Sequence, residues 1–402
     1  MDVFQSGISL VKFKNNEMDP QIGLFCDSFP PIMDGVAVCM QNYAHWMQKK
    51  VGNVTVVTPH KNNAHYKDYD FSVLDFMSVP VPGRRPYVTG IPQIDPVFLI
   101  KLLQRDFRII HAHSPFSAGF LASEVARAQK IPLVATFHSK FRDDFKKEIP
   151  VDKVVDQMVK IIVDFFNRAD EVWVPQESVI DVIREYGYKG PLEVVENGSD
   201  LVTDYPESFF ADARRDLGIG PDEFVLLFVG QHIWQKNTRL IIDALEQLKD
   251  LSFRMFFVGT GYAAEEMKAL VREKGLDEKV TFVGVLTDRP SIVKYYAAAD
   301  LFLFPSLYDN APLVVREAAA LHTPAVMVEG STAATILRDG ENGFLSGGSL
   351  EAFTAKVRSL MADRERVRKV GLTASRSIVR SWEDIVGEVL DRYEALIARK
   401  SK

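Results

Sequence analysis

Short apolar runs alternate with longer amphipathic stretches along the chain, and the chain goes through this alternation twice. β-Branched and aromatic runs predict strands, and apolar positions spaced three and four apart predict helices. The predicted strands are residues 22–27, 54–58, 73–79, 109–111, 133–137, 171–174 and 192–195 in the first half, and 224–229, 253–258, 280–283, 301–305 and 325–328 in the second. The predicted helices include residues 36–50, 151–168, 238–248, 263–274 and 313–321. This order indicates an α/β fold with two mostly parallel, doubly wound sheets.

A polar segment at residues 196–220 separates the two halves, and we place the domain boundary near residue 205. The first domain is then residues 1–205 and the second is residues 206–382. The last stretch is amphipathic, so it needs a packing partner. We expect residues 383–402 to return to the first domain. A ligand should bind at the carboxyl ends of the parallel strands, in a cleft between the domains.

Composition narrows the class of protein. Of 402 residues, 47% are hydrophobic and 25% are charged, as in an ordinary globular protein, and the net charge of 48 − 54 = −6 gives no electrostatic footprint for nucleic acid. The two cysteines, Cys26 and Cys39, cannot build a disulfide framework, so a reducing cytoplasmic setting is expected. The apolar part of residues 1–20 is too short for a secretory signal, and no apolar run is long enough to span a bilayer.

The window FPSLYDNAPLVVREAAALHTPAV, residues 304–326, carries the densest chemistry. A strand ends near Pro305, a loop holds Asp309, and a helix is predicted to begin between residues 310 and 312. The first free backbone N–H groups, those of Leu313 and Val314, can receive a diphosphate. Asp309 and Glu317 then bracket that phosphate site and can hold a sugar hydroxyl and a ribose diol. The alternative is a surface acid in the loop and a solvated acid on the helix.

The window LLFVGQHIWQKN, residues 226–237, follows a predicted strand and carries Gln231, His232 and Lys236. A lysine in such a loop can neutralise a phosphate as a point charge. The alternative is a lysine that faces solvent.

Histidines follow two predicted strands of the first half, in HAHSPF and ATFHSKF. His111, His113 and His138 suit hydrogen bonding to a sugar or acid–base chemistry near neutral pH. The alternative is buried histidines with satisfied hydrogen bonds. Zinc is disfavoured, because there is no HExxH motif and no cysteine partner is evident. A glycine turn, VGTGYAA at residues 258–264, matches a dinucleotide fingerprint only loosely, and we interpret it as a tight strand-to-helix turn.

Together these windows resemble the family 4 retaining glycosyltransferases, which have the GT-B fold of two Rossmann-like domains facing across a cleft. The matching stretches run in order along the chain: SFPPIMDGVAVCMQNYAHWM, HAHSPFSAGFLA, VATFHS, VENGSD, FVGQHIWQKN, FVGTG, FVGVLTD and DGENGFL. The stretch FHSKFRDDFKKEIP resembles the bacterial diacylglycerol glucosyltransferase type. The resemblance implies an acceptor domain in the first half and a nucleotide-sugar donor domain in the second.

The resemblance also implies roles for single residues. Gly35 matches the glycine loop near the donor phosphate and sugar, and His138 matches the histidine that contacts the donor sugar. Lys236 matches the lysine on the diphosphate, Glu317 matches the acid on the ribose, and Val285 stands where the backbone reads the base. Asp309 takes the place of the first of the family's paired glutamates, with a shorter reach toward the sugar.

Two departures from the family pattern concern the phosphate site. Gln231 stands where the family often has arginine, so one positive charge is missing. Pro312 follows Ala311 where the family usually has glycine, and proline removes one N–H from the phosphate cradle.

The resemblance implies transfer of a sugar, with glucose favoured, from a UDP-sugar to a hydroxyl acceptor such as diacylglycerol. It implies retention of configuration and neither a metal nor a cofactor. The alternatives are an epimerase or phosphorylase of the same fold and a catalytically silent sugar-nucleotide binding protein. An NAD-dependent oxidoreductase is the most distant of these, because no acid follows the second strand of the glycine-turn unit.

A basic and apolar face on the first domain would suit an anionic membrane surface. Its members are Arg84, Arg85, Arg142, Lys146 and Lys147, beside Phe141 and Phe145. Peripheral contact with the inner face of a membrane is therefore a hypothesis from the sequence. Its weakness is charge: residues 140–168 hold nearly as many acidic as basic side chains.

Overall fold

The computed structural model describes residues 21–82 and 86–401. The segment 1–20 and two members of the predicted basic face, Arg84 and Arg85, lie outside the described residues. The chain forms two compact units. The first comprises residues 1–135, 168–170 and 393–402, and the second comprises residues 136–167 and 171–392. The predicted domain boundary near residue 205 stays a prediction.

A parallel sheet organises the first half of the chain, in the strand order β3-β2-β1-β6-β7-β8-β9. Its strands are β1 Gln21–Phe25, β2 Val54–Pro59, β3 Ser72–Phe76, β6 Phe107–Ala112, β7 Leu133–Thr136, β8 Glu171–Val174 and β9 Glu193–Val194. The helices of this half are α1 Gly35–Val51, α2 Pro96–Leu103, α3 Ser117–Gln129, α4 Phe141–Glu148, α5 Asp152–Phe166 and α6 Val179–Glu185. β1 and β2 are buried along their whole length, as expected for strands that helices cover on both faces.

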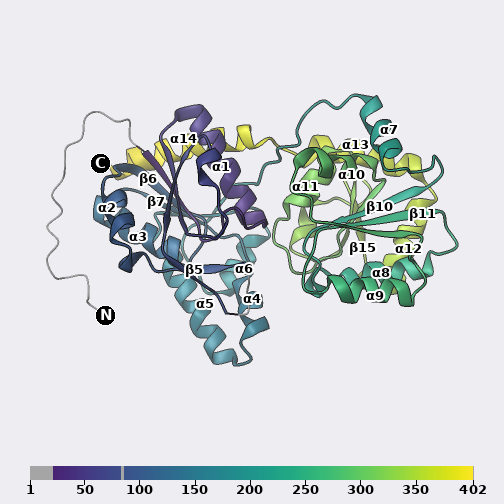
Figure 1. Cartoon of the computed structure of the whole chain (residues 1–402), viewed down its shortest axis with the longest axis horizontal. Coiled ribbons are helices and arrows are strands. Elements are labelled where there is room, and N and C mark those ends of the chain that lie inside the picture. Colours follow the sequence, from purple (N-terminus) through teal and green to yellow (C-terminus); the bar gives the residue numbers. More distant parts are fainter. Residues whose placement is uncertain (1–20, 83–85, 402) are drawn as a thin grey trace. The chain divides into compact units, whose positions relative to one another are not determined.

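The second sheet lies wholly within the second unit and has the order β12-β11-β10-β13-β14-β15, again parallel. Its strands are β10 Phe224–Val229, β11 Phe253–Val258, β12 Val280–Gly284, β13 Leu301–Leu303, β14 Ala325–Val328 and β15 Phe344–Ser346. The helices are α7 Glu207–Asp216, α8 Thr238–Gln247, α9 Ala264–Glu273, α10 Arg289–Ala298, α11 Leu313–Ala320, α12 Leu350–Met361, α13 Arg364–Ser377 and α14 Trp382–Lys400. α8 and α9 cover one face of this sheet, and α10 and α11 cover the other (Figure 1). The predicted doubly wound α/β architecture is confirmed.

The last turns of α14 belong to the first unit, as predicted for the end of the chain. The Tyr393 hydroxyl lies 2.6 Å from Nδ1 of His111, and both residues are buried. At the end of the helix, Lys400 forms an ion pair of 2.6 Å with Asp170. These contacts give the amphipathic helix the packing partner that its sequence pattern requires.

The predicted strand at residues 73–79 was wrong in extent. Residues 73–79 divide at Met77 into β3 and β4, Ser78–Pro80, and β4 pairs antiparallel with β5, Val88–Gly90. The Met77 N–H turns away from the sheet to donate to the Asp95 carboxylate at 3.0 Å. The predictions also lacked α4 and β15. α4 is short and very polar, and β15 has only three residues, so neither has the length from which a periodic pattern is recognised.

Candidate functional site

Lys236 ends a short 3₁₀ turn, Trp234–Lys236, in the loop after β10. Its ammonium donates to both oxygens of Asp309, at 2.6 and 2.8 Å, and the two side chains are only 12% and 18% exposed. Its aliphatic stem passes Gly230, where a Cβ would lie 3.6 Å from it, and its ammonium lies 5.2 Å from the centre of the Phe304 ring. The alternative of a lysine that faces solvent was therefore wrong.

Asp309 lies in the loop after β13, and its carboxylate is held from two sides. Besides Lys236, the Ser306 hydroxyl donates to Oδ2 at 2.6 Å. The structure thus joins a predicted phosphate-binding lysine and a predicted sugar-binding acid into one ion pair at the carboxyl ends of β10 and β13. It overturns the alternative of a free surface acid.

Glu317 lies on α11 and is buried, with an 8% exposed side chain. Oε1 accepts from Nη2 of Arg289 at 3.0 Å, and Oε2 accepts from the Tyr296 hydroxyl at 2.7 Å. Burial raises the pKa of the Tyr296 phenol, and the neighbouring Glu317 raises it further, so the phenol keeps its proton and donates. The alternative of a solvated helix acid was wrong.

The helix α11 begins at Leu313, the first residue of the helix predicted at 313–321 and one residue after the start that the cap signals predicted. Pro312 is the N-cap and has an extended conformation. Asn310 does not cap the helix; its side-chain amide donates to the backbone oxygen of His138 at 3.0 Å. The backbone N–H groups of Leu313 and Val314 therefore form the first turn. The macrodipole of the helix favours an anion in front of them.

Two further candidates stand at the rim of the same sheet edge. Gln231 is exposed in the loop after β10. Val285 is exposed and follows Gly284, whose φ of 86° turns the chain out of β12. The Gly284 carbonyl accepts from the N–H of Gly259 at 2.8 Å, so the end of β12 is tied to the turn after β11.

The glycine turn after β11 packs against the Lys236 loop. A Cβ on Gly259 would lie 2.0 Å from the Gly230 oxygen, and a Cβ on Gly261 would lie 2.3 Å from the His232 oxygen. These glycines are required for the close approach of two loops, which agrees with the interpretation as a tight turn.

His232 anchors the Lys236 loop in the core. The centre of its ring lies 6.2, 6.0 and 5.9 Å from the ring centres of Phe228, Phe257 and Phe282. Neither ring nitrogen has a hydrogen-bond partner within the described residues. Burial, aided by Lys268, lowers the pKa of His232 to about 4. The histidine is neutral at physiological pH and acts as an aromatic core residue.

Gly35 lies in the first unit, at the first position of α1. Asp34 caps the helix by accepting from the Ala37 N–H at 2.8 Å, and it also accepts from the hydroxyls of Ser28 and Tyr87. A Cβ on Gly35 would meet no described atom within 4 Å. Packing within this unit therefore does not require glycine at this position.

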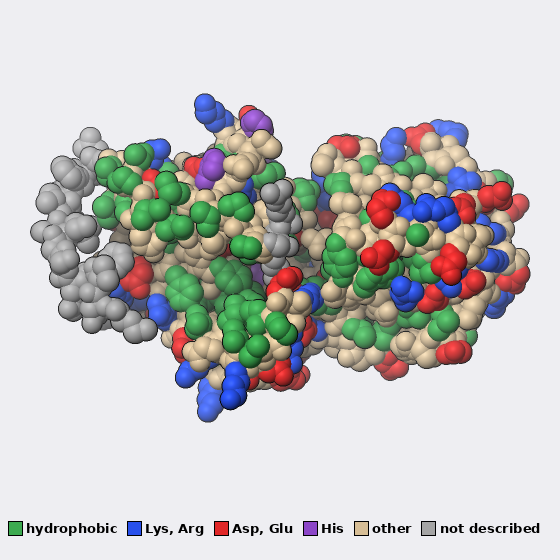
Figure 2. Space-filling model, turned by 60° about the horizontal axis from the view of Figure 1, so that its bottom comes forward, with side chains coloured by type: hydrophobic (Ala, Val, Ile, Leu, Met, Phe, Trp, Pro, Cys, Tyr) green, Lys and Arg blue, Asp and Glu red, His purple; other side chains and the backbone are tan. Residues whose placement is uncertain are grey.

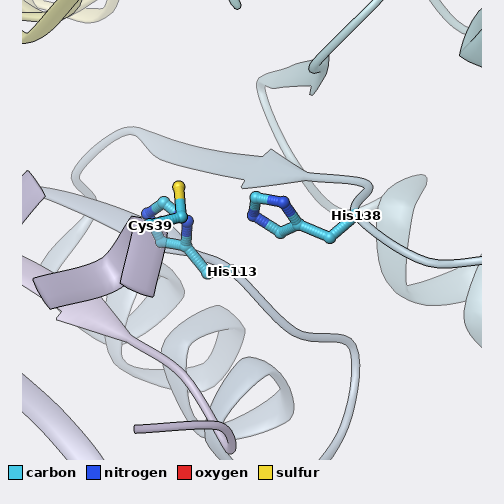
Figure 3. Close-up of side chains that lie close together, drawn as sticks. All are labelled: Cys39, His113 and His138. Carbon is cyan, nitrogen blue, oxygen red and sulfur yellow. The ribbon is translucent and has the colours of Figure 1, made fainter. Parts of the chain in front are cut away.

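Two predicted histidines of the first unit, His111 and His113, are buried. His111 contacts Tyr393, as the alternative of satisfied histidines predicts. Cys39 on α1 and His113 after β6 point their sulfur and ring nitrogen to within 4.8 Å of each other (Figure 3). The expectation that no cysteine accompanies these histidines was thus wrong for His113.

His138 follows β7 and belongs to the second unit. Burial lowers its pKa to about 4, so it is neutral at pH 7. A neutral imidazole can donate one hydrogen bond and accept another. His138 and Asp309 are connected through Asn310, which follows Asp309 and holds the backbone of His138.

The predicted basic and apolar face is not formed by its members on α4, and its other members, Arg84 and Arg85, lie outside the described residues. Phe141 and Phe145 are buried, and the cations are paired: Arg142 with Asp156 at 2.8 Å, Lys146 with Asp152 at 3.3 Å, and Lys147 with Asp144 at 3.2 Å. Within the described residues this segment offers no unpaired cluster of these cations. No helix in the described parts of the chain is long and apolar enough to cross a bilayer.

The sequence reasoning missed Arg289, Tyr296 and Ser306. Ser306 lay inside a window that was already singled out, and Arg289 comes directly after the stretch FVGVLTD. No local pattern marks Tyr296, because its partner Glu317 is 21 residues away and lies on another helix.

Comparisons with known proteins find glycosyltransferase family models in both halves of the chain. Residues 33–202 match the model of Glycosyltransferase Family 4, and residues 209–376 match that of Glycosyl transferases group 1. The alpha-monoglucosyldiacylglycerol synthase of Streptococcus pneumoniae is 26% identical over 353 residues, covering 85% of this chain and 78% of that protein. The synthase of the same name from Acholeplasma laidlawii is 23% identical, covering 80% and 84%.

Solved structures show the same fold. HepE of Anabaena, in complex with UDP and glucose, has a TM-score of 0.76 at 19% identity and covers 93% of this chain and 99% of its own. The sucrose-phosphate synthase of Thermosynechococcus elongatus has a TM-score of 0.77 at 20% identity, covering 94% and 100%.

Proposed function

Because the chain belongs to the family 4 glycosyltransferases of GT-B fold, we propose that it transfers glucose from UDP-glucose to a lipid hydroxyl with retention of configuration. The observation that carries the proposal is the pairing of Lys236 with Asp309 next to the first turn of α11. A cation and a helix N-terminus lie next to each other there, and both favour the binding of a diphosphate.

In the proposed complex the diphosphate lies between Lys236 and the N–H groups of Leu313 and Val314. Glu317 accepts from the ribose hydroxyls, and the backbone at Val285 meets the base. Asp309, released from Lys236, accepts from a hydroxyl of the sugar. Gln231 supplies a neutral hydrogen bond at the rim.

The proposed reaction breaks the bond between the sugar C1 and the diphosphate oxygen and forms a bond from C1 to the acceptor oxygen on the same face. The acceptor proton passes to the departing phosphate oxygen, so no protein base is consumed. Lys236 and the helix N-terminus stabilise the charge that develops on the leaving group. Neutral His138 orients the sugar.

The acceptor is proposed to be a membrane lipid such as diacylglycerol, because the relatives in Streptococcus and Acholeplasma are named as monoglucosyldiacylglycerol synthases. A second observation supports contact with a bilayer. Val97, Ile100 and Leu103 form one stripe along α2, and Ile94 ends the short 3₁₀ turn that precedes the helix. Each of the four is 59% to 61% exposed, while Phe98 and Leu102 pack inward. Figure 2 shows hydrophobic side chains gathered on the part of the surface that carries this helix.

A helix that is apolar on both faces is unusual in contact with water. We therefore propose α2, in place of the α4 face, as the segment that lies in the interface of an inner, cytoplasmic membrane leaflet. Co-sedimentation with vesicles that contain anionic lipid tests this. The double substitution Val97→Ser and Ile100→Ser should abolish binding, whereas Val154→Ser at an exposed position of α5 should not. Equal binding of the parent and the double variant would rule α2 out.

The donor proposal is tested by thermal shift and by release of UDP. UDP-glucose should raise the melting temperature, since a ligand that binds only the folded state stabilises it. With diacylglycerol in vesicles, UDP should be released and a glucolipid formed. Conversion of free UDP-glucose without an acceptor would identify an epimerase, and binding without any turnover would identify a silent binding protein.

A further inference from the structure

We propose that Arg289 and Tyr296 position the Glu317 carboxylate for the ribose, so that selection of a ribonucleotide over a deoxyribonucleotide depends on them. This inference rests on the proposed function, in which Glu317 meets the ribose of the donor. Neither residue touches the reacting sugar, so both are positioning residues.

The geometry around Glu317 assigns one donor to each carboxylate oxygen. Nη2 of Arg289 lies 3.0 Å from Oε1, and the Tyr296 hydroxyl lies 2.7 Å from Oε2. A carboxylate oxygen has two acceptor sites, so each oxygen keeps one for a further donor. Two oxygens fixed in one plane with one acceptor site each match a vicinal diol, which offers two O–H groups.

Arg289 is itself held in place from both ends. It is the first residue of α10, where Asp288 caps the helix by accepting from the Ser291 N–H at 2.9 Å. Its Nη2 bridges Glu317 and the carboxylate of Asp200. A flexible side chain fixed by a helix start and two acids can determine the orientation of a third group.

Burial makes the orientation matter. The Glu317 side chain is only 8% exposed, so in the described residues its carboxylate depends on protein donors more than on water. Without Arg289, one oxygen would lose a charged donor, and the carboxylate would rotate about its last torsion, which is broad. The ribose would then meet a poorly aligned acceptor.

The position of Arg289 along the chain agrees with this role. It stands four residues after Val285, which the resemblance places at the base, and its guanidinium reaches Glu317, placed at the ribose. Nε of Arg289 is buried and has no acceptor among the described residues, so the guanidinium is not fully used by the protein.

The test compares UDP with 2′-deoxy-UDP by isothermal titration, using the parent, Arg289→Met, Arg289→Lys and Tyr296→Phe. Hydrogen bonds to a charged group predict that the parent binds UDP about tenfold or more tightly than 2′-deoxy-UDP. In Arg289→Met this ratio should fall to within about twofold, because the misaligned Glu317 carboxylate no longer accepts a good hydrogen bond from the 2′-hydroxyl. Arg289→Lys should keep an intermediate ratio, because it retains the charge but not the fork.

Lys294→Met is the matched control. Lys294 lies on the same helix, and its side chain forms an exposed ion pair of 2.7 Å with Asp216 in place of a contact with Glu317. It should keep the parent ratio. If Arg289→Met fails to fold, judged by near-UV circular dichroism, Tyr296→Phe provides the same comparison through the other oxygen.

The outcomes separate the two proposals. If the parent prefers UDP and both Arg289→Met and Tyr296→Phe keep its full preference, positioning by these residues is wrong while the donor class stands. If the parent binds UDP and 2′-deoxy-UDP equally, the inference is also wrong. If the parent binds no uridine nucleotide, the proposed donor itself fails.

Discussion

Two acids on one short segment, Asp309 and Glu317, are held in different ways. Asp309 lies in a loop and pairs with Lys236, a flexible cation from a second loop that contacts no other acid in the described structure. Glu317 lies on a helix, and two donors from another helix, Arg289 and Tyr296, fix its two oxygens. We therefore expect Lys236 and Asp309 to change partners when the donor binds, and Glu317 to keep its two donors.

The physical reason is the number of acids that each cation contacts, since each carboxylate also accepts from one hydroxyl, that of Ser306 or that of Tyr296. Lys236 is 12% exposed and loses its single counterion when Asp309 moves, so an incoming diphosphate can take the place of that carboxylate. Arg289 has a second acid, Asp200, so the loss of one of its contacts leaves the other in place. This difference indicates that the contact between Lys236 and Asp309 rearranges when the donor binds, whereas the contacts of Glu317 persist.

The largest expected effect concerns neither acid but His138, the residue proposed to orient the sugar. His138→Ala should lower kcat by about 10²- to 10⁴-fold, the range for a positioned group that acts in the transition state, and leave the Kd of UDP within about twofold of the parent. Steady-state kinetics and titration of UDP measure the two quantities. An unchanged kcat with a raised KM would make His138 a uniform binding group instead.

The comparison predicts opposite responses to removal of the two charges. Glu317→Gln should lower the free energy of unfolding by about 2 kcal/mol, less than a fully buried pair, because Arg289 is partly exposed. Added UDP should stabilise this variant less than the parent, since a ribose contact is lost. Chemical denaturation with and without UDP measures both effects. A variant as stable as the parent, with full stabilisation by UDP, would break the contrast.

Asp309→Asn should behave differently, with a loss of about 1 kcal/mol in the absence of ligand because Lys236 loses its counterion. UDP should stabilise it more than the parent, since no carboxylate competes for the ammonium. Turnover should still fall, because the acceptor for the sugar hydroxyl is weakened. A smaller stabilisation by UDP than in the parent would show that Asp309 does not compete with the diphosphate.

A pH-dependent effect sharpens the comparison by changing His232, which holds the Lys236 loop in the core. His232 has a folded pKa of about 4, below the ordinary value of 6.5, so the unfolded chain binds its proton first as the pH falls. The stability that this residue contributes is complete above pH 6.5 and is lost down to pH 4, at up to about 1.4 kcal/mol per pH unit.

His232→Leu should therefore flatten the fall in stability between pH 6.5 and 4, measured by denaturation in urea at each pH. Part of the slope should remain, because burial also lowers the pKa of His138. Parallel pH profiles for the parent and the variant would contradict the assignment of His232 as a neutral core residue.

Much of the fold could be predicted from the sequence. Both ends of β10 were predicted correctly, because six consecutive apolar side chains, FVLLFV, are typical of a short strand that is buried on both faces. The strand ending near Pro305 was predicted too long by two residues, since β13 ends at Leu303. Length and apolar pattern determine the existence of an element better than its ends.

The pairings within the site could not be predicted. Lys236 and Asp309 are 73 residues apart, and their contact depends on β10 and β13 being neighbours in the sheet. The order of strands is a tertiary property that no local window contains. The resemblance to the family identified both residues as candidates, but it did not predict that they would form an ion pair with each other.

The central claim is that Lys236 is the cation that receives the diphosphate of the donor. Titration of UDP and of uridine into the parent and into Lys236→Met tests it most directly, because uridine lacks the group that the lysine is said to bind. We predict that the parent prefers UDP by about a hundredfold or more, and that Lys236→Met loses most of this preference while its affinity for uridine is unchanged. An equal preference for UDP in both proteins would contradict the account.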